Sequence, residues 1–177
     1  MGTRTEGLTL LELVIALAIA TILLLLATPA YHAWIADVEL RDRVEALVGA
    51  MSFARSEAIK QNSRVDLCPS DDGLHCSTGG RWEAGWIMFA DDNDNGERDA
   101  DETILRVEAK SYPGITVRGN RPVRDYVSYM SSGQTRMKSG ALQMGTFTVC
   151  RSGQKEVDVV LANGGRVRID RTKVPCP

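Results

Sequence analysis

Side chains that carry oxygen ligands follow one another in a short acidic stretch of the chain. Asp91, Asn93 and Asn95 occupy alternate positions, Gly96 comes next, and Glu102 lies six positions beyond the glycine. This spacing is typical of an EF-hand loop, in which alternating oxygens wrap a calcium ion. EF-hand loops join helices, whereas the flanking sequences WIMFA and ETILRV are typical of strands. We therefore expect a solvated turn between two strands and no cofactor, with a calcium site as the alternative.

Cationic side chains near the C-terminus have the spacing of a binding strip. Arg166 and Arg168 alternate with apolar residues, so a strand would project both from one face. Arg171 and Lys173 follow closely. Such a strip binds phosphates with little sequence preference and loses affinity as salt rises, which predicts a nucleic-acid ligand. The alternatives are a solvated hairpin face and a contact with a neighbouring subunit.

The distribution of charge along the chain is uneven. The net charge is only −2, but residues 1–109 hold 9 Lys and Arg against 19 Asp and Glu, whereas residues 110–177 hold 12 against 4. The two parts therefore carry charges of −10 and +8, and an anionic partner would meet the second part. Five further cations would extend the strip if the fold brought them to the same surface: Arg118, Arg121, Arg124, Arg136 and Lys138.

Groups for acid–base or nucleophilic catalysis are sparse. The only histidines are His32, beside an apolar run, and His75, between two cysteines. Neither belongs to a recognisable Ser-His-Asp or Cys-His set. We therefore expect neither an enzyme nor a small-molecule substrate.

The four cysteines fall into two local pairs, Cys68 with Cys76 and Cys150 with Cys176. None forms a CxxC motif and no histidine lies at zinc-ligand spacing, which disfavours a metal or redox site. An even number of cysteines in a chain with an N-terminal membrane signal, described next, indicates an oxidising compartment, so we expect two disulfides. Four buried free thiols are the alternative.

An apolar run near the N-terminus is long enough to cross a membrane. Residues 8–30 hold one charge, and about 23 helical residues at ~1.5 Å each span a ~30 Å hydrocarbon core. The polar leader 1–7 precedes the run directly, so cleavage between Gly7 and Leu8 would leave the helix attached. The single charge is Glu12, which is costly in lipid unless it is paired. The new amine of a neighbouring subunit would neutralise it, and an unpaired or protonated carboxyl near the membrane surface is the alternative.

A second helical pattern and then a series of strands follow. Residues 31–62 predict an amphipathic helix whose apolar stripe covers a sheet, whereas its charged residues, Arg43 included, face solvent. Residues 63–177 predict a β-rich globular head. The stripe consists of Leu40, Val44, Leu47, Met51, Ala54 and Ala58. Strand-like runs lie at 64–68, 85–90, 103–108, 115–118, 126–131, 146–151, 157–162 and 166–170, and Asn163-Gly164-Gly165 predicts a hairpin between the last two.

The sequence GLTLLEL at 7–13, followed by an apolar helix with Pro29, resembles the class III signal of type IV pilins and type II secretion pseudopilins. The resemblance implies cleavage by prepilin peptidase, methylation of the amino group of Leu8, where the family usually has Phe, and packing of the helix into a filament core. It also implies an α+β type IV pilin fold, in which a long N-terminal helix packs on an antiparallel sheet.

Three later stretches resemble the GspH/FimT-FimU branch of that superfamily: FARSEAIKQNSRVDLC, GWIMFADDNDNGERDADETILR and GRVRI. FimT-like minor pilins include DNA receptors that use a GRxR motif, which residues 165–168 match. The resemblance implies a minor pilin that helps to initiate pilus assembly near the tip and binds double-stranded DNA in natural transformation. It implies a single-pass inner-membrane protein with a periplasmic head that later moves to the pilus, and other pilins as partners. A GspH-like minor pseudopilin of a type II secretion system is the alternative.

Overall fold

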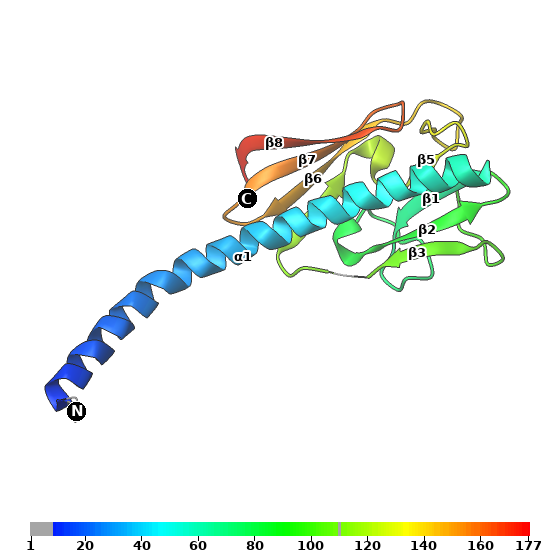
Figure 1. Ribbon diagram of the computed structural model, residues 1–177. Coiled ribbons are helices and arrows are strands. Elements are labelled where there is room, and N and C mark those ends of the chain that lie inside the picture. Colours follow the sequence, from blue (N-terminus) through cyan, green and yellow to red (C-terminus); the bar gives the residue numbers. More distant parts are fainter. Residues whose placement is uncertain (1–8, 110) are drawn as a thin grey trace, which may run out of the picture. The chain divides into compact units, whose positions relative to one another are not determined.

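The computed structural model describes residues 9–109 and 111–177, which form a long helix and a β-rich head (Figure 1). Helix α1 runs from Leu10 to Gln61. The chain divides into two compact units, residues 1–38 and 39–177, so that α1 belongs to both. The expected cleavage site between Gly7 and Leu8 lies outside the described residues.

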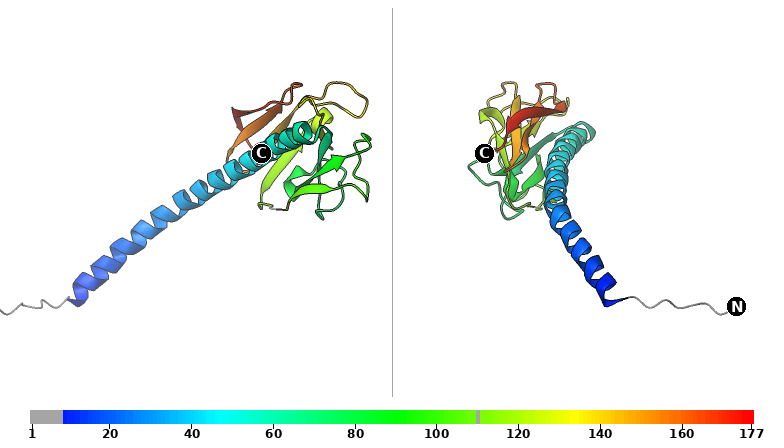
Figure 2. Two further views of the ribbon diagram at one scale, coloured as in Figure 1. Left: turned by 45° about the vertical axis from the view of Figure 1, so that its right-hand side comes forward. Right: turned by 90° about the vertical axis from the view of Figure 1, so that its left-hand side faces the viewer.

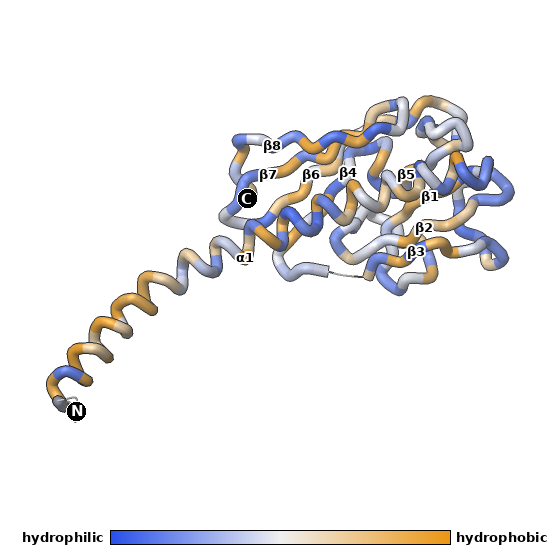
Figure 3. Tube along the Cα trace, in the orientation of Figure 1, coloured by the Kyte–Doolittle hydropathy of each residue, from blue (hydrophilic) through white to orange (hydrophobic). Residues whose placement is uncertain are grey.

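The part of α1 from Leu10 to Ala30 is apolar on almost every side, with Glu12 as its single charge. The helix continues through Pro29. The large apolar side chains from Leu10 to Leu26 are all more than half exposed, and Figure 3 shows this run as an almost unbroken hydrophobic band. A helix that is hydrophobic all round is normally covered by lipid or by other helices. This segment is long and apolar enough to cross a membrane.

The described part of the second unit holds two antiparallel sheets of four strands each. Sheet A has the strand order β3-β2-β1-β5 and sheet B the order β4-β6-β7-β8. The strands of sheet A are β1 (Arg64–Pro69), β2 (Trp86–Asp91), β3 (Ile104–Glu108) and β5 (Val127–Tyr129). Those of sheet B are β4 (Ile115–Gly119), β6 (Gly145–Arg151), β7 (Lys155–Leu161) and β8 (Val167–Pro175). Two short 3-10 turns, η1 (Trp82–Ala84) and η2 (Arg121–Val123), lie between strands. Every predicted strand is present, and β8 continues beyond its predicted end.

The second half of α1 packs against both sheets (Figures 1 and 2). All members of the predicted apolar stripe are buried. Leu47 and Met51 of the helix share one core cluster with Met88 of sheet A and Phe147 of sheet B. The prediction of the stripe is therefore confirmed, because a sheet is what the apolar side of the helix covers.

Arg43 is buried, although the helical pattern predicted that it faces solvent. It is 1% exposed, its guanidinium donates to the carbonyl of Trp82 at 2.6 Å, and it lies 4.1 Å from the ring centroid of Trp86. Burial lowers the pKa of Arg43. The prediction was wrong because helical periodicity marks apolar positions only. A long cationic side chain can be buried beside them when a carbonyl and an aromatic face receive it.

Candidate functional site

The two arginines of the GRVR sequence lie on one face of sheet B. β7 and β8 form the predicted hairpin, and Arg168 lies opposite Val160 in its register. Arg166 precedes β8, and its carbonyl accepts the N–H of Ala162 at 2.9 Å. Because alternate residues of a strand point to the same side, Arg166 and Arg168 share the face that Val160 and Ala162 occupy. We call it the outer face, since the buried side chains of β7 point to the opposite side.

Arg171 and Lys173 do not continue this row. Arg171 lies opposite Val157 and lines a small notch together with Val44 and Glu45 of α1, on the inner side of the sheet. Lys173 falls where the register between β7 and β8 shifts. The expected strip of four cations is therefore split, because an odd spacing along a strand turns the later residue to the opposite face.

Both Arg166 and Arg168 are accessible. Arg168 forms an ion pair with Asp170 at 2.9 Å, in which the side chains are 69% and 47% exposed. Such a surface pair contributes at most about 1 kcal/mol, so a phosphate can replace the carboxylate. Arg166 is exposed and has no ion pair among residues 9–109 and 111–177. Three of the five further cations are paired elsewhere: Arg118 with Glu83, Arg124 with Asp125, and Lys138 with Glu97.

An open groove of about 690 Å³ lies on the outer face beside Arg168. It is called the outer-face groove below, and its lining includes Asn120, Pro122, Met144, Val160, Ala162 and Asn163. Sequence reasoning missed this groove, because its apolar lining comes from three separate segments of the chain. Arg121 stands between two of the lining residues in the sequence and is exposed.

Close packing fixes the hairpin that carries Arg166. Of the turn residues 163–165, only Gly165 has a positive φ, +75°. A Cβ placed on Gly165 would meet the carbonyl oxygen of Gly133 and lie 3.1 Å from Tyr129 Cε1. The N–H of Thr135 also donates to the carbonyl of Asn163 at 3.3 Å. The glycine of the GRVR sequence therefore has a structural role, because no side chain fits at its position.

The acidic stretch forms the turn between β2 and β3. The carboxylate of Asp91 accepts the N–H groups of Asn95 at 3.1 Å and Gly96 at 2.7 Å, and its Oδ2 lies 3.2 Å from Arg64 Nε. The carboxylate of Glu102 accepts two other backbone N–H groups. A guanidinium thus lies beside the first carboxylate of the EF-hand pattern. Because backbone N–H groups and this guanidinium already contact the two carboxylates, the arrangement fits a turn better than a calcium site. Within the described ranges no group of three His, Cys, Asp or Glu side chains is placed to hold a metal ion.

A buried carboxylate, which sequence reasoning missed, lies beside this turn. Asp66 in β1 is fully buried. Its Oδ1 lies 3.3 Å from Arg64 Nε, whereas its Oδ2 has no hydrogen-bond partner in the described part of the chain. Burial raises the pKa of Asp66 to about 6, against the attraction of Arg64. Arg64 also donates to Ser128 Oγ and to the carbonyl of Asp94, so one guanidinium links β1, β5 and the acidic turn.

The cysteines form the two expected disulfides. One bond joins Cys68 to Cys76 and closes a short surface loop. The other joins Cys150 of β6 to Cys176 and holds the C-terminal end of the chain against sheet B. The N–H of Arg151 donates to Cys176 Sγ at 3.2 Å.

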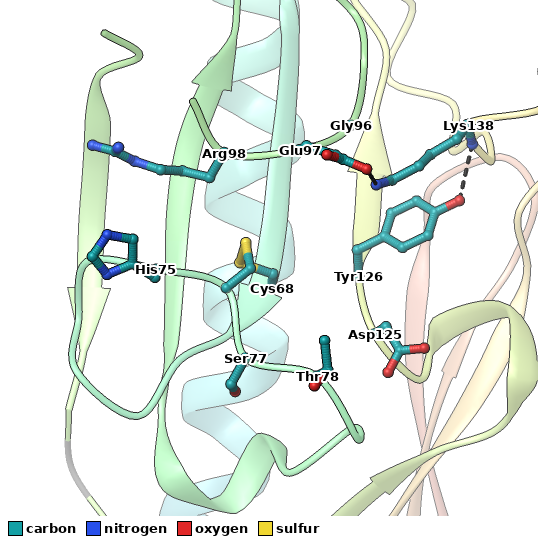
Figure 4. Close-up of a pocket in the computed structure, with 11 residues that line it drawn as sticks. Cys68, His75, Ser77, Thr78, Gly96, Glu97, Arg98, Asp125, Tyr126 and Lys138 are labelled. Carbon is teal, nitrogen blue, oxygen red and sulfur yellow. Dashed lines mark hydrogen bonds and ion pairs between the residues drawn. A yellow bond between two sulfur atoms is a disulfide. The ribbon is translucent and has the colours of Figure 1, made fainter. Parts of the chain in front are cut away.

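A second cavity of about 420 Å³ lies between the loop of the first disulfide and the acidic turn (Figure 4). Its charged side chains are used inside the protein. Lys138 pairs with Glu97 at 3.2 Å, and its backbone N–H donates to the hydroxyl of Tyr126 at 2.9 Å. Asp125 pairs with Arg124 at 3.1 Å. We assign this cavity no ligand.

Glu12 lies in the first turn of α1. Its backbone N–H donates to Thr9 Oγ1 at 3.3 Å. A carboxylate suits a helix N-terminus electrostatically, but the described part of the chain supplies it with no ion pair. The pairing expected from the sequence needs the amine of another subunit, so a single chain does not test it.

A model of the family described as type II transport protein GspH matches residues 43–165. Comparison with curated protein sequences gives no match.

Solved structures with the same fold include two pilin-like proteins. The crystal structure of the type IV minor pilin FimU of Pseudomonas aeruginosa strain PAO1 in space group P21 has a TM-score of 0.57 at 17% identity, covering 78% of this chain and 96% of FimU. The minor pseudopilin EpsH from the type 2 secretion system of Vibrio cholerae has a TM-score of 0.50 at 13% identity, covering 75% of this chain and 97% of EpsH. At these identities the likeness shows the fold alone.

Proposed function

Because the chain belongs to the family of the type II transport protein GspH, we propose that it acts as a minor pilin, an assembly subunit of a type IV pilus. Its fold, one long N-terminal helix packed on antiparallel sheets, is the type IV pilin fold of FimU and EpsH. In this proposal the chain works by packing against other pilins and not by catalysis. It helps to initiate the fibre and stays near its tip.

The observation that carries this proposal is the change in character of α1 along its length. Up to Leu26 its large apolar side chains are exposed, whereas from Leu40 onward one stripe is buried against the head. The exposed part requires lipid before assembly and other helices afterwards. One helix therefore serves both as the membrane anchor and as the surface that forms the filament core.

In the proposed route to the pilus, prepilin peptidase cuts between Gly7 and Leu8, and the new amino group is methylated. The subunit then lies in the inner membrane with its head in the periplasm, where two disulfides suit the oxidising conditions. N-terminal mass mapping of assembled material tests this route. A start at methylated Leu8 is expected, and an intact Met1 or a terminus near Ala30 contradicts it.

The role of Glu12 tests the assembly function itself. Glu12→Ala is expected to leave membrane insertion intact, since removing a charge lowers the cost of insertion, and to impair joining of the filament. Membrane fractionation measures the first property, and immunoblots of sheared pili measure the second. Thr21→Ala, a polar change in the same helix that removes no charge, is the matched control. Normal incorporation of Glu12→Ala would contradict the pairing.

Arg166 and Arg168 favour a second activity of the same subunit, binding of double-stranded DNA during natural transformation. The two guanidinium groups project from one exposed face, in the part of the chain that carries a charge of +8. A few phosphate contacts give weak binding without sequence preference, which fades well before ~0.5 M salt.

Fluorescence anisotropy with a labelled duplex and the full-length protein in neutral detergent tests the DNA activity. Arg166→Gln with Arg168→Gln is expected to abolish most of the binding. Arg171→Gln with Lys173→Gln removes the same charge from the other part of β8 and should retain most of it. If the parent does not bind at low salt, or the first double variant binds as well as the parent, the DNA activity fails and the assembly function stands.

A minor pseudopilin of a type II secretion system is the alternative with the same fold, and the description of the matching family favours it. Deletion of the chain in its own cells separates the two functions. Loss of surface pili supports the minor pilin, whereas loss of protein secretion with normal pili supports the pseudopilin.

A further inference from the structure

The outer-face groove offers apolar surface that phosphate groups cannot use. Met144 is 48% exposed at the groove, and Val160 and Pro122 add two more apolar side chains to the lining. An exposed apolar surface beside cationic side chains is matched by a ligand that carries both anionic and apolar parts.

The polar groups of the groove are mainly uncharged. Asn163 is exposed, and Asn120 uses its Oδ1 to accept the N–H of Thr146 at 3.3 Å, which leaves its amide NH₂ as a donor. Side-chain amides carry both donors and acceptors and so match the hydrogen-bonding edges of nucleobases.

Both arginines lie at the edge of this lining. Arg168 is itself a lining residue, and Arg166 lies opposite Ala162, another of them. The carboxylates of this face, Asp158 and Asp170, lie opposite each other in the next register position, further along the strands. The groove end of the face is therefore its cationic end.

We propose that the outer-face groove receives unpaired bases of single-stranded DNA, while Arg166 and Arg168 hold the adjoining phosphates. This inference rests on the proposed DNA activity and adds a preference to it. Bases in a duplex are stacked and paired inside the helix, so only a single strand can place a base against Met144 and Val160.

Charge density makes this preference testable. A duplex carries more charge per unit length than a single strand. A face that binds only phosphates therefore binds the duplex at least as tightly as the single strand, and its binding of the duplex is more sensitive to salt. Contacts to bases reverse that order and leave a part of the affinity that salt does not remove. The proposed groove therefore predicts tighter binding of the single strand as the salt concentration rises.

The experiment compares a labelled single-stranded oligothymidylate with a duplex of the same number of phosphates, using the full-length protein in neutral detergent over a salt series. Met144→Ser is expected to weaken binding of the single strand about fivefold, as loss of an apolar side-chain contact does, and to leave binding of the duplex unchanged. Val160→Thr, which keeps the branched shape, should act in the same direction. Leu142→Ser is the matched control, since Leu142 is similarly exposed (44%) and does not line the groove.

The results separate two claims, the DNA activity of the arginines and the binding of bases in the outer-face groove. Equal binding of both DNA forms, with no effect of Met144→Ser but loss in the arginine double variant, overturns the groove and retains the DNA activity. No binding of either form by the parent removes both. If Met144→Ser instead weakens crosslinking to a neighbouring pilin and leaves DNA binding unchanged, the groove is an assembly surface and the inference is wrong.

Discussion

Replacing Asp66 by Asn is expected to remove a pH-dependent part of the stability of the head. Asp66 is fully buried, and burial raises its pKa from the ordinary 3.8 to about 6. Because the pKa is higher in the folded state, that state binds the proton more tightly. The resulting stabilisation is complete below about pH 4 and is lost as the pH rises through about 6.

The size of the effect follows from the shift in pKa. About two units at ~1.36 kcal/mol each give about 3 kcal/mol for the complete change. Part of this change can be measured at moderate pH, since lowering the pH from about 7.5 to about 5 should add about 1 kcal/mol to the free energy of unfolding. Asp99 and Glu57 are examples of carboxylates whose pKa is lowered. They change the free energy of unfolding only at lower pH, because they lose their charge only in more acid solution.

Urea unfolding of the full-length protein in neutral detergent, followed by the fluorescence of the buried Trp82 and Trp86, measures the effect. Asn has a similar shape to Asp without the charge, so the free energy of unfolding of Asp66→Asn should rise less on acidification than that of the parent, by about 1 kcal/mol. Asp92→Asn, which removes an exposed carboxylate of the acidic turn, should keep the pH dependence of the parent. Equal changes in the parent and in Asp66→Asn would refute the reasoning.

The remaining predictions concern packing in the head and use the same urea assay under non-reducing conditions. Gly165→Ala should cost at least about 1 kcal/mol because its Cβ meets Gly133, whereas Gly164→Ala, with nothing within 4 Å, should cost less. Arg43→Leu should cost about 1 kcal/mol, since it removes the charged donor to the carbonyl of Trp82, which keeps the N–H of Gly85 at 3.3 Å. Cys176→Ser should cost about 3 kcal/mol through loss of the bond that ties down β8. An unchanged unfolding midpoint in any of these three variants would contradict the contact on which it rests.

Local patterns were enough to predict the elements of this protein. The apolar stripe from Leu40 to Ala58 and all of the strands follow from periodicities of 3.6 and 2 residues, which the backbone imposes wherever one side of an element is buried. The two disulfides follow from pairs of cysteines that are close in the sequence or close to the chain end. The hairpin follows from Asn163-Gly164-Gly165, although only Gly165 needs its positive φ.

The segment between Gly119 and Gly145 shows where local patterns fail. It has little periodicity, yet Gln143 is fully buried there. Its amide donates to the carbonyls of Pro122 and Tyr126 and accepts the N–H of Ser128. These partners lie 15 to 21 residues from Gln143 in the sequence, so no short periodic pattern encodes them.

The sequence by itself therefore determined which residues form the apolar part of the helix, its amphipathic part and the strands, and it placed Arg166 and Arg168 on one face of the hairpin. Only the tertiary structure decided that Arg43 and Asp66 are buried and that a groove adjoins the arginines. The physical reason is that periodicity reports the surroundings of one element at a time. The burial of a charge, or the lining of a groove, depends on side chains that several elements bring together.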